Sequence, residues 1–359
     1  MPLFVASRKG LFRFTEKAGS WRSDPPAFLG EPVSAVLVDP RDGVIYAALR
    51  LGHFGNKLHR STDNGKTWTE LKTPALPADP TAKDGAAPAV DMIWTLVAGG
   101  TDQPGELWAG TLPGALFRST DQGATWSLVE GLWNRPERKE WMGGGYDLSG
   151  LHTILVDPVD PKRLTIAVST GGVWRSDDRG KTWRLVGKGL RNAYMPPERA
   201  YEEGVQDVHR LARSPSLPNV LWCQHHNGIF RSINGGDTFT EIVDVKPSVF
   251  GFAVAAHPKI PDIAWFVPAI KDERRVAVDG RLVVNRTSDG GKTFEQLGSG
   301  LPEKDCFDLI YRHGLDVDAT GETLAMGSTT GNLWVGRGGG KRWTLVSAHL
   351  PPIAQVAFA

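Results

Sequence analysis

The chain has 359 residues, of which 40% are apolar and 23% are charged, so it can bury a large core. Its 41 basic and 40 acidic side chains leave a formal net charge of +1. That balance argues against a protein that binds nucleic acid or an anionic membrane surface, because both need a basic excess.

A twelve-residue pattern recurs along the chain. The segment "RSTDNGKTWTEL" begins at Arg60, and related segments begin at Arg118, Arg175, Arg231 and Arg286. Two weaker copies begin at Phe14 and Gly336, and the closing aromatic residues are Trp21, Trp68, Trp126, Trp183, Phe239, Phe294 and Trp343. Their spacing of 47 to 58 residues indicates an array of similar supersecondary units.

Each unit is expected to contain four short strands. In the fourth unit the apolar or alternating runs are residues 151–157, 164–169, 172–176 and 182–186, and turn residues separate them. No amphipathic helix of useful length is evident. Seven four-stranded units predict an all-β fold, a single seven-bladed β-propeller spanning residues 1–359.

The two ends of the chain predict how this ring closes. Residues 2–7, "PLFVAS", resemble the second strand of a unit, so the first unit lacks an innermost strand. Residues 353–359, "IAQVAFA", resemble the innermost strands of other units, such as "VSAVLVD". We therefore expect blade one to consist of residues 1–25 plus 353–359, which would leave no open sheet edge in the ring.

The recurring motif Ser-x-Asp-x-Gly-x-Thr-Trp falls between the third and fourth strands of each unit. An Asp in such a turn accepts hydrogen bonds from nearby backbone N–H groups, and the Gly allows a left-handed backbone. The Trp is expected to start the fourth strand and to pack between neighbouring blades. Five strong copies favour a structural role over an active site, and the seventh unit has Gly338 at the Asp position.

This motif resembles the Asp box of the BNR-repeat propellers, and the resemblance covers the whole chain. The family includes sialidases, xyloglucan-cleaving glycosidases, sortilin-type receptors and a photosystem II assembly factor. The chain is similar in particular to bacterial single-domain propellers described as glycosyl hydrolase-like or sialidase-like. In that family the Asp boxes lie on the face opposite the active site. The chain lacks the Phe-Arg-Ile-Pro motif of true sialidases, since Arg13 lies in "GLFRF" without the Pro, so sialidase activity is not expected.

Two histidines stand out on the strands expected to line the channel. His152 lies five residues before Asp157, and His209 lies five residues before Ser214, so both occupy the same register on successive innermost strands. We expect both imidazoles at the channel, with His225 or His226 of "CQHHNG" nearby. The structural alternative is that each histidine bonds a neighbouring carbonyl and that "HHNG" is an ordinary turn.

The remaining candidates lie on loops of the face opposite the boxes. Long inter-blade loops at 73–90, 130–150 and 187–207 are expected to wall a funnel, because loops of this length are often functional. Arg side chains on the same face suit a carboxylate or sulfate, although solvated loop charge is the alternative. The predicted catalytic residues are His152, His209, His225, Asp207 and Arg275, and the predicted ligand-binding residues are Arg8, His53, Trp141, Tyr146, His226, Asn227 and Arg274.

Two functional hypotheses follow. The first is a hydrolase-like enzyme that binds a small polar, carbohydrate-derived ligand in the central funnel. The second is a non-catalytic propeller that serves as a scaffold for ligand or protein binding. A divalent metal held by His152, His209 and His226 is considered but not favoured, because no H-x-x-x-H spacing supports it.

The cellular setting is inferred from what the sequence lacks. The first residues show no basic region ahead of a long apolar run, and no segment approaches 18 uninterrupted apolar residues. Only Cys223 and Cys306 are present, which fits a reducing compartment better than a disulfide framework. We expect a cytoplasmic monomer that binds neither nucleic acid nor membranes.

Overall fold

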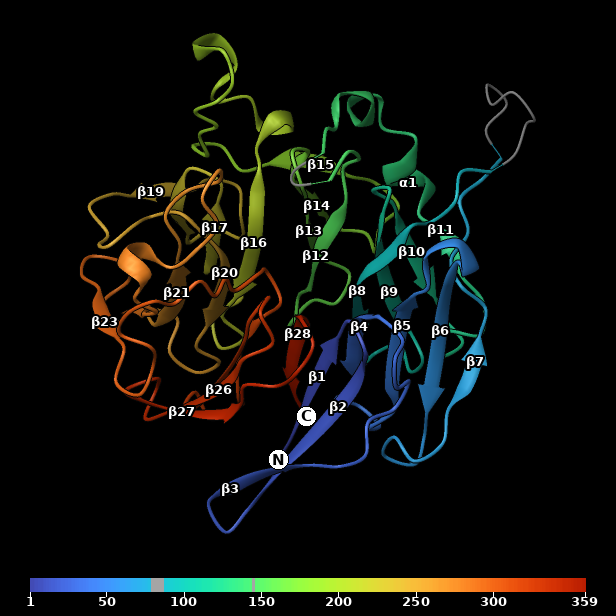
Figure 1. Ribbon diagram of the computed structural model, residues 1–359. Coiled ribbons are helices and arrows are strands. Elements are labelled where there is room, and N and C mark those ends of the chain that lie inside the picture. The colour runs from blue at the N-terminus through green and yellow to red at the C-terminus, as the bar shows by residue number, and fades with distance from the viewer. Residues whose placement is uncertain (79–86, 144–145) are drawn as a thin grey trace.

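The computed structural model describes residues 1–78, 87–143 and 146–359. Its strands form seven four-stranded antiparallel sheets, which follow one another around a ring in chain order. In Figure 1 the colour therefore runs once around the ring from blue to red. The predicted seven-bladed β-propeller is confirmed, and each blade follows the predicted order of strands from the channel outward.

The strands of the first four blades are these. Blade one has β28 (Ile353–Phe358), β1 (Pro2–Ser7), β2 (Gly10–Lys17) and β3 (Ser20–Ser23). Blade two has β4 (Val33–Val38), β5 (Ile45–Arg50), β6 (Asn56–Ser61) and β7 (Thr69–Leu71). Blade three has β8 (Met92–Ala98), β9 (Leu107–Leu112), β10 (Leu116–Ser119) and β11 (Ser127–Leu128). Blade four has β12 (Leu151–Val156), β13 (Leu164–Val168), β14 (Gly172–Ser176) and β15 (Arg184–Val186).

The last three blades repeat this plan. Blade five has β16 (Val208–Arg213), β17 (Leu221–His225), β18 (Gly228–Ser232) and β19 (Thr240–Ile242). Blade six has β20 (Gly251–Ala256), β21 (Ala264–Pro268), β22 (Val284–Thr287) and β23 (Glu295–Leu297). Blade seven has β24 (Leu315–Val317), β25 (Thr323–Gly327), β26 (Leu333–Arg337) and β27 (Arg342–Ser347).

Helical structure is confined to single turns in the connections. The described chain has one short α-helix, α1 (Glu130–Trp133), and five 3-10 turns: η1 (Gly52–Phe54), η2 (Pro136–Glu140), η3 (Pro197–Arg199), η4 (Glu203–Val205) and η5 (Val278–Gly280). None of these described helices is long and apolar enough to cross a bilayer. Cys223 and Cys306 are both buried and form no disulfide.

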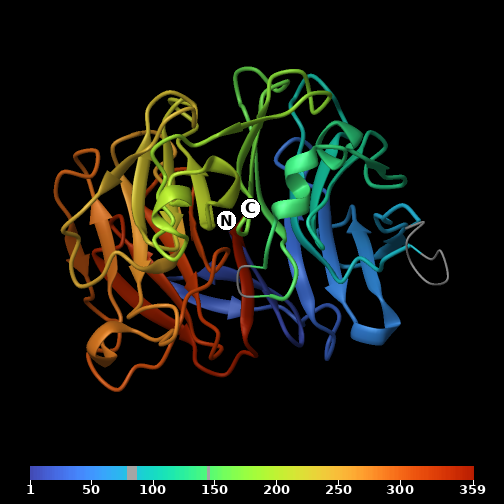
Figure 2. The same ribbon diagram turned by 90° about the horizontal axis from the view of Figure 1, so that it is seen from above.

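The C-terminal strand closes the ring as predicted. β28 pairs antiparallel with β1, with Val356 opposite Val5, and becomes the innermost strand of blade one. The two ends of the chain consequently lie beside each other, with red β28 next to blue β1 in Figure 1 and near the ring's centre in Figure 2. Ile353 and Val356 are buried against blade one and blade seven.

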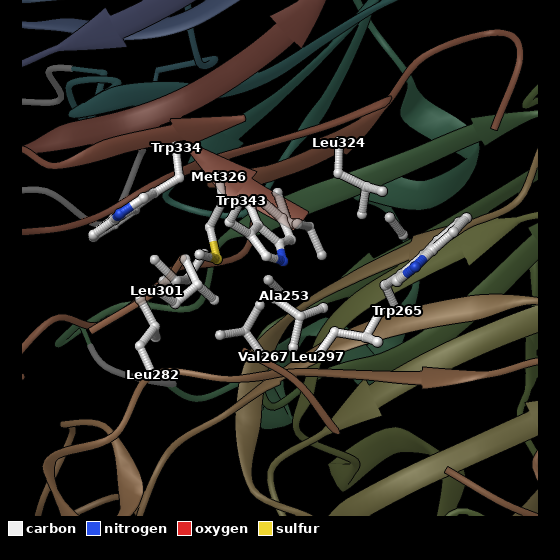
Figure 3. Packing of buried hydrophobic residues seen from close by; sticks show 14 of the residues in the cluster. Ala253, Trp265, Val267, Leu282, Leu297, Leu301, Leu324, Met326, Trp334 and Trp343 are labelled. Atoms are coloured by element: carbon white, nitrogen blue, oxygen red, sulfur yellow. The ribbon is translucent and has the colours of Figure 1, made fainter. Parts of the chain in front are cut away.

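The hydrophobic core lies between the blades. The second strand of a blade is covered on both faces, and every residue of β13, β17, β21 and β25 is buried. Between blades six and seven, Trp265 and Val267 of β21 pack in one cluster with Met326, Trp334 and Trp343 (Figure 3). Such interlocking side chains explain why these strands read as continuous apolar runs in the sequence.

The Asp boxes are hydrogen-bonded within themselves. In blade three Asp121 Oδ1 accepts bonds from Ser119 Oγ (2.8 Å) and Thr125 N–H (2.9 Å), and Asp121 Oδ2 accepts one from Thr125 Oγ1 (2.6 Å). Gly123, with φ of 82°, donates its N–H to Ser119 Oγ (2.9 Å). The same two bonds from the Thr recur at Asp63, Asp178 and Asp289. At Asn234 the backbone bond from Thr238 is kept, but the side-chain amide of Asn234 donates to Thr238 Oγ1 (2.9 Å).

The tryptophans of the strong boxes, Trp68, Trp126 and Trp183, pack between blades as expected, but each lies one residue before the fourth strand rather than starting it. Trp183 precedes β15 and shares a buried cluster with Trp108 of blade three. The reason is that the preceding Thr182 is still bound to Asp178, so the backbone joins the sheet only at Arg184. The boxes therefore serve the fold, with their polar groups satisfied internally.

Deleting residues 353–359 should open the ring. The deletion would expose the edge of β1 and remove Ile353 and Val356 from the core, so we expect aggregated protein or a melting temperature lowered by roughly 10 °C or more. Thermal unfolding followed by circular dichroism, with size-exclusion chromatography, measures the effect. Removal of Ala359 alone is the control, and a full deletion that melts like the parent would contradict the role of closure.

Asp121→Ala should destabilise the fold by about 1–3 kcal/mol, because backbone and hydroxyl donors of one box lose their acceptor. Urea unfolding of the variant and the parent gives this difference. The matched control is Glu303→Ala, which removes an exposed carboxylate that makes none of these bonds. Equal stability of Asp121→Ala and Glu303→Ala would show that the box bonds are dispensable.

Candidate functional site

The innermost strands share one irregularity near their first residue. A register shift leaves one residue unpaired near the start of the strand, at Ser34, Trp94, His152, His209 and Ala354. Phe252 holds this position in β20, and His313 lies five residues before Asp318 in the segment entering β24. The predicted equal register of His152 and His209 is thus part of a sevenfold ring of equivalent positions, which we call the bulge ring.

Several bulge-ring side chains connect neighbouring blades. His152 Nε2–H donates to the carbonyl oxygen of Val208 (2.8 Å), and His209 Nδ1–H donates to that of Gly251 (2.6 Å). Ser34 makes the equivalent bond to the carbonyl of Ile93 (2.8 Å). Each acceptor is near the start of the next innermost strand, so these bonds hold adjacent blades together.

The two histidines differ in their second ring nitrogen. Thr153 Oγ1 donates to His152 Nδ1 (2.9 Å), so the fully buried His152 has both nitrogens occupied. These contacts are the ones expected from the structural alternative, in which His152 bonds a neighbouring carbonyl oxygen. His209 keeps Nε2 directed toward Asp207, whose Oδ1 lies 4.0 Å away. Burial lowers the pKa of His209 to about 3, so its imidazole is neutral.

The third ring histidine was missed in the sequence. His313 is buried and its Nε2–H donates to the carbonyl oxygen of His152 (2.9 Å), joining blade seven to blade four. The spacing that singled out His152 and His209, five residues before the turn residue that ends the strand, applies equally to His313 and Asp318. The signal was present in the sequence and could have identified this residue.

A cavity of about 290 Å³ opens at the channel mouth on the face opposite the Asp boxes. It lies over the bulge-ring positions of Ser34 and Ala354, whose small side chains leave space that a larger side chain would fill. Its lining comes from ring positions, turns between second and third strands and inter-blade loops: Arg8, Ser34, Met92, Trp94, Tyr146, Arg275, Tyr311, Arg312, His313 and Ala354. Three predicted residues, Arg8, Tyr146 and Arg275, are thereby brought together.

The charge of this cavity is one-sided. Arg8, Arg275 and Arg312 line it, and no carboxylate of the described chain does so. Asp272 pairs with Arg275 from outside the lining (2.5 Å), whereas no described carboxylate pairs with the exposed Arg8. Arg312 lies 5.1 Å from the ring centre of Trp94. The cavity therefore has the electrostatic character of an anion-binding site with aromatic walls.

Other predicted residues lie outside the cavity lining. His53 is exposed in η1 and contacts Phe54 with the ring centres 3.9 Å apart, and Arg274 is exposed in the turn beside Arg275. Trp141 packs against Trp174 at 5.9 Å. None of the three lines the cavity.

The turn after β17 is tied to the long loop before β16. Asn227 Oδ1 accepts the N–H of Ala193 (2.6 Å), and its own N–H donates to His225 Nδ1 (3.1 Å). His225 is buried and its Nε2 has no partner in the described chain. Asn227 and His225 thus position the loop at 187–207 rather than line the cavity.

A second group of polar side chains lies next to the cavity. Asp207 lies just before β16. Its Oδ2 is 3.3 Å from His226 Nδ1, and its Oδ1 is 4.0 Å from His209 Nε2. Tyr194 Oη also lies 3.3 Å from Asp207 Oδ2. The predicted trio His152, His209 and His226 is not assembled as such, because His152 is turned to Val208 and Thr153, and Asp207 occupies the third place.

The long inter-blade loops contribute unequally to this face. The loop at 130–150 supplies Tyr146 to the cavity, and the loop at 187–207 supplies Tyr194 to the Asp207 group. Arg138 packs on Trp133 at 3.6 Å and bonds its carbonyl, so these two residues stabilise their own loop. Residues 79–86 and 144–145 of the predicted funnel wall lie outside the described part of the chain.

Several hollows elsewhere are larger, and two of them lie among the blades but gather less functional chemistry. One lies between blades one and two near Trp68, on the Asp-box side, with a mostly apolar lining. The other surrounds Asp157 and Arg213 at the opposite channel mouth, and those two side chains approach each other there (3.8 Å). Neither lining brings three guanidinium groups together without a carboxylate, so the cavity beneath Arg8 is the stronger candidate.

Known sequence families match only the boxes. The model of the BNR/Asp-box repeat matches residues 59–70 and 117–128, and that of the BNR-Asp box repeat matches residues 173–186. The chain carries BNR/Asp-box repeats, as the sequence predicted. It is 27% identical over 304 residues to a xyloglucanase from a Paenibacillus species, covering 73% of this chain but 28% of that enzyme.

Solved structures show the same fold. A GH74 xyloglucanase from Xanthomonas campestris aligns with a TM-score of 0.66 at 17% identity, covering 96% of this chain and 52% of that one. YCF48 from Cyanidioschyzon merolae aligns with a TM-score of 0.55 at 13% identity, covering 89% and 86% of the two chains. The chain thus spans about a quarter of the first of these xyloglucanases and about half of the second, and the solved structures share its propeller fold.

The channel wall beside the bulge ring holds a half-buried carboxylate. Asp316 of β24 accepts the N–H of Phe358 through Oδ2 (2.8 Å), and the charge of Arg210 on β16 acts on it. Burial raises the pKa of Asp316 to about 6, and these two favourable interactions only partly oppose the rise. The folded protein therefore holds a proton on Asp316 at a pH where the unfolded chain has lost it.

This shift predicts a pH dependence of stability. Because the folded-state pKa is raised, the free energy of unfolding should fall as pH rises from about 4 to about 6 and then level off. Asp316→Asn should remove this dependence. The pH-dependent change in the free energy of unfolding should be at most about 2 kcal/mol, because channel water screens part of the burial penalty. Urea unfolding of both proteins from pH 4 to pH 7 measures it, and parallel curves would contradict the shift.

Proposed function

We propose that the cavity at the channel mouth binds a small anionic ligand derived from a carbohydrate, and that the protein acts on it as a glycosidase-like hydrolase. The observation that carries the proposal is the convergence of three guanidinium groups and three aromatic side chains on one cavity without a lining carboxylate. Enclosed sites with a few convergent polar groups are the usual form of small-ligand sites.

The anionic character of the ligand follows from the arginines. A guanidinium group presents parallel N–H donors that match the two oxygens of a carboxylate or the face of a sulfate. Arg275 is already oriented by Asp272, while Arg8 at the rim is free to close on a bound anion. Tyr146 and Trp94, whose ring centres are 5.3 Å apart, offer apolar surfaces to a sugar ring beside that charge.

The reaction class is supported by the similarity to xyloglucanases, of which this chain matches only a part. Glycoside hydrolysis generally uses two carboxyl groups across the scissile bond. Three carboxylates are linked to residues that line the cavity. Asp272 pairs with Arg275, and the charge of Asp207 acts on Arg312. Asp91 pairs with Arg50, which lies beside Tyr146. Hydrolysis in the cavity would have to use two of these three.

A non-catalytic scaffold is the second candidate function, and the exposed apolar side chains on this face favour it. Met142, Leu148, Tyr194 and Tyr201 of the long loops are each more than 40% exposed. A protein partner covering these loops would bury them. This alternative predicts no measurable affinity for small sugars and no turnover.

The arginine site is tested by ligand titration. Isothermal titration with D-glucuronate, D-galacturonate and D-glucose should show binding of an acidic sugar in preference to glucose. Arg8→Ala should weaken that binding by about tenfold or more, because one charge-assisted hydrogen bond is lost. Lys9→Ala is the matched control, since Lys9 lies in the same turn with the same charge but does not line the cavity.

The outcomes separate the hypotheses. Equal affinity for glucose and the acids, or equal loss in Lys9→Ala and Arg8→Ala, would refute the arginine site. Release of 4-nitrophenol from acidic 4-nitrophenyl glycosides would establish hydrolysis. Binding without turnover would reject the hydrolase assignment, and absence of both would leave the scaffold.

A further inference from the structure

We propose that Asp207, His209 and His226 form a binding site for one divalent transition-metal ion beside the channel-mouth cavity. The ligand atoms of the three side chains all lie within 4.8 Å of one another. This site is distinct from the anion-binding cavity and does not depend on the function proposed for that cavity.

His209 is oriented as a metal ligand. A carbonyl oxygen can only accept a hydrogen bond, so the contact with Gly251 (2.6 Å) places the proton of the imidazole on Nδ1. The lone pair of Nε2 is then directed at Asp207 Oδ1, 4.0 Å away. Two electron-rich atoms face each other there without a hydrogen between them, which is unfavourable unless a cation lies between them.

Asp207 supplies an unsatisfied buried oxygen. The residue is 4% exposed, and Oδ1 accepts no hydrogen bond from any described residue. A buried carboxylate oxygen without a donor costs free energy, and nearly all buried polar groups in folded proteins are paired. Oδ1 points at the position where an ion held by His209 Nε2 would lie.

His226 completes the set from a fixed position. Its Nδ1 lies 3.3 Å from Asp207 Oδ2, and its backbone N–H donates to the carbonyl oxygen of Asp207 (2.9 Å). Ligand atoms around a tetrahedral ion with bonds of about 2.1 Å are about 3.4 Å apart. The three ligand atoms here lie within 4.8 Å of one another, so the side chains have to approach one another by up to about 1.4 Å to surround the ion.

The donor set indicates the class of ion. Two imidazoles and one carboxylate suit Zn²⁺ and neighbouring first-row ions, whereas Mg²⁺ and Ca²⁺ prefer oxygen ligands. Three protein ligands leave a coordination position open, as in catalytic rather than structural zinc sites. The ring of Phe252 stacks on that of His209, with ring centres 4.3 Å apart, and its centre is 5.1 Å from that of Tyr311 in the cavity lining. The ring of Phe252 would therefore lie between the ion site and the cavity.

The competing explanation needs no metal. His226 could carry a proton on Nδ1 and donate it to Asp207 Oδ2 at 3.3 Å. That arrangement satisfies Oδ2 but leaves Oδ1 and the lone pair of His209 facing each other, so it accounts for less of the geometry.

Metal binding is tested directly on protein treated with EDTA and then dialysed. Isothermal titration with ZnCl₂ should show one site per chain with a Kd of about 10 μM or tighter, and thermal unfolding should shift upward with ZnCl₂ but not with MgCl₂. His226→Gln and Asp207→Asn should each weaken Zn²⁺ binding by about 30-fold or more. His349→Ala removes an exposed histidine elsewhere and should leave binding unchanged.

His226→Gln keeps the test valid if Asp207→Asn does not fold, because His226 is only partly buried and at a turn. A Kd for Zn²⁺ weaker than about 10 μM, or binding that is unchanged in both His226→Gln and Asp207→Asn, would overturn the proposal. The titration contains no sugar, so its outcome is separate from that of the arginine site.

Discussion

The architecture depends on the need of each sheet to be covered on both faces. A four-stranded blade with apolar residues on each side is stable only between two neighbours, and seven blades meet this need only when the ring is closed. β28 provides that closure by pairing with β1. The bulge-ring bonds from Ser34, His152 and His209 to the next blade then fix how the blades meet at the channel.

The two faces of the ring use polar groups in opposite ways. On the Asp-box face, the carboxylate of Asp121 and its equivalents accept bonds from their own turns, so these residues are satisfied before any ligand arrives. On the other face, no described carboxylate pairs with Arg8, and no described residue donates to Asp207 Oδ1. Unsatisfied polar groups with complementary geometry distinguish the face that can bind from the face that stabilises the fold.

Much of this could be predicted from the sequence, because the fold is repetitive. The period of the boxes gives the number of blades, and the resemblance of residues 353–359 to innermost strands gives the closure. The site was harder to predict, because His152 and His209 share a register but differ in their neighbours: Thr153 occupies the second nitrogen of His152, while His209 faces Asp207. The cavity depends on small residues at Ser34 and Ala354, whose significance appears only when all seven blades are placed together.

The hydrogen bond from His313 to the carbonyl oxygen of His152 crosses the central channel. It links blades seven and four, which lie on opposite sides of the channel, at a distance of 2.9 Å. Blades seven and four therefore meet across the channel beside the channel-mouth cavity, which His313 also lines. A residue of the bulge ring thus forms part of the floor of the candidate site as well as a contact between distant blades.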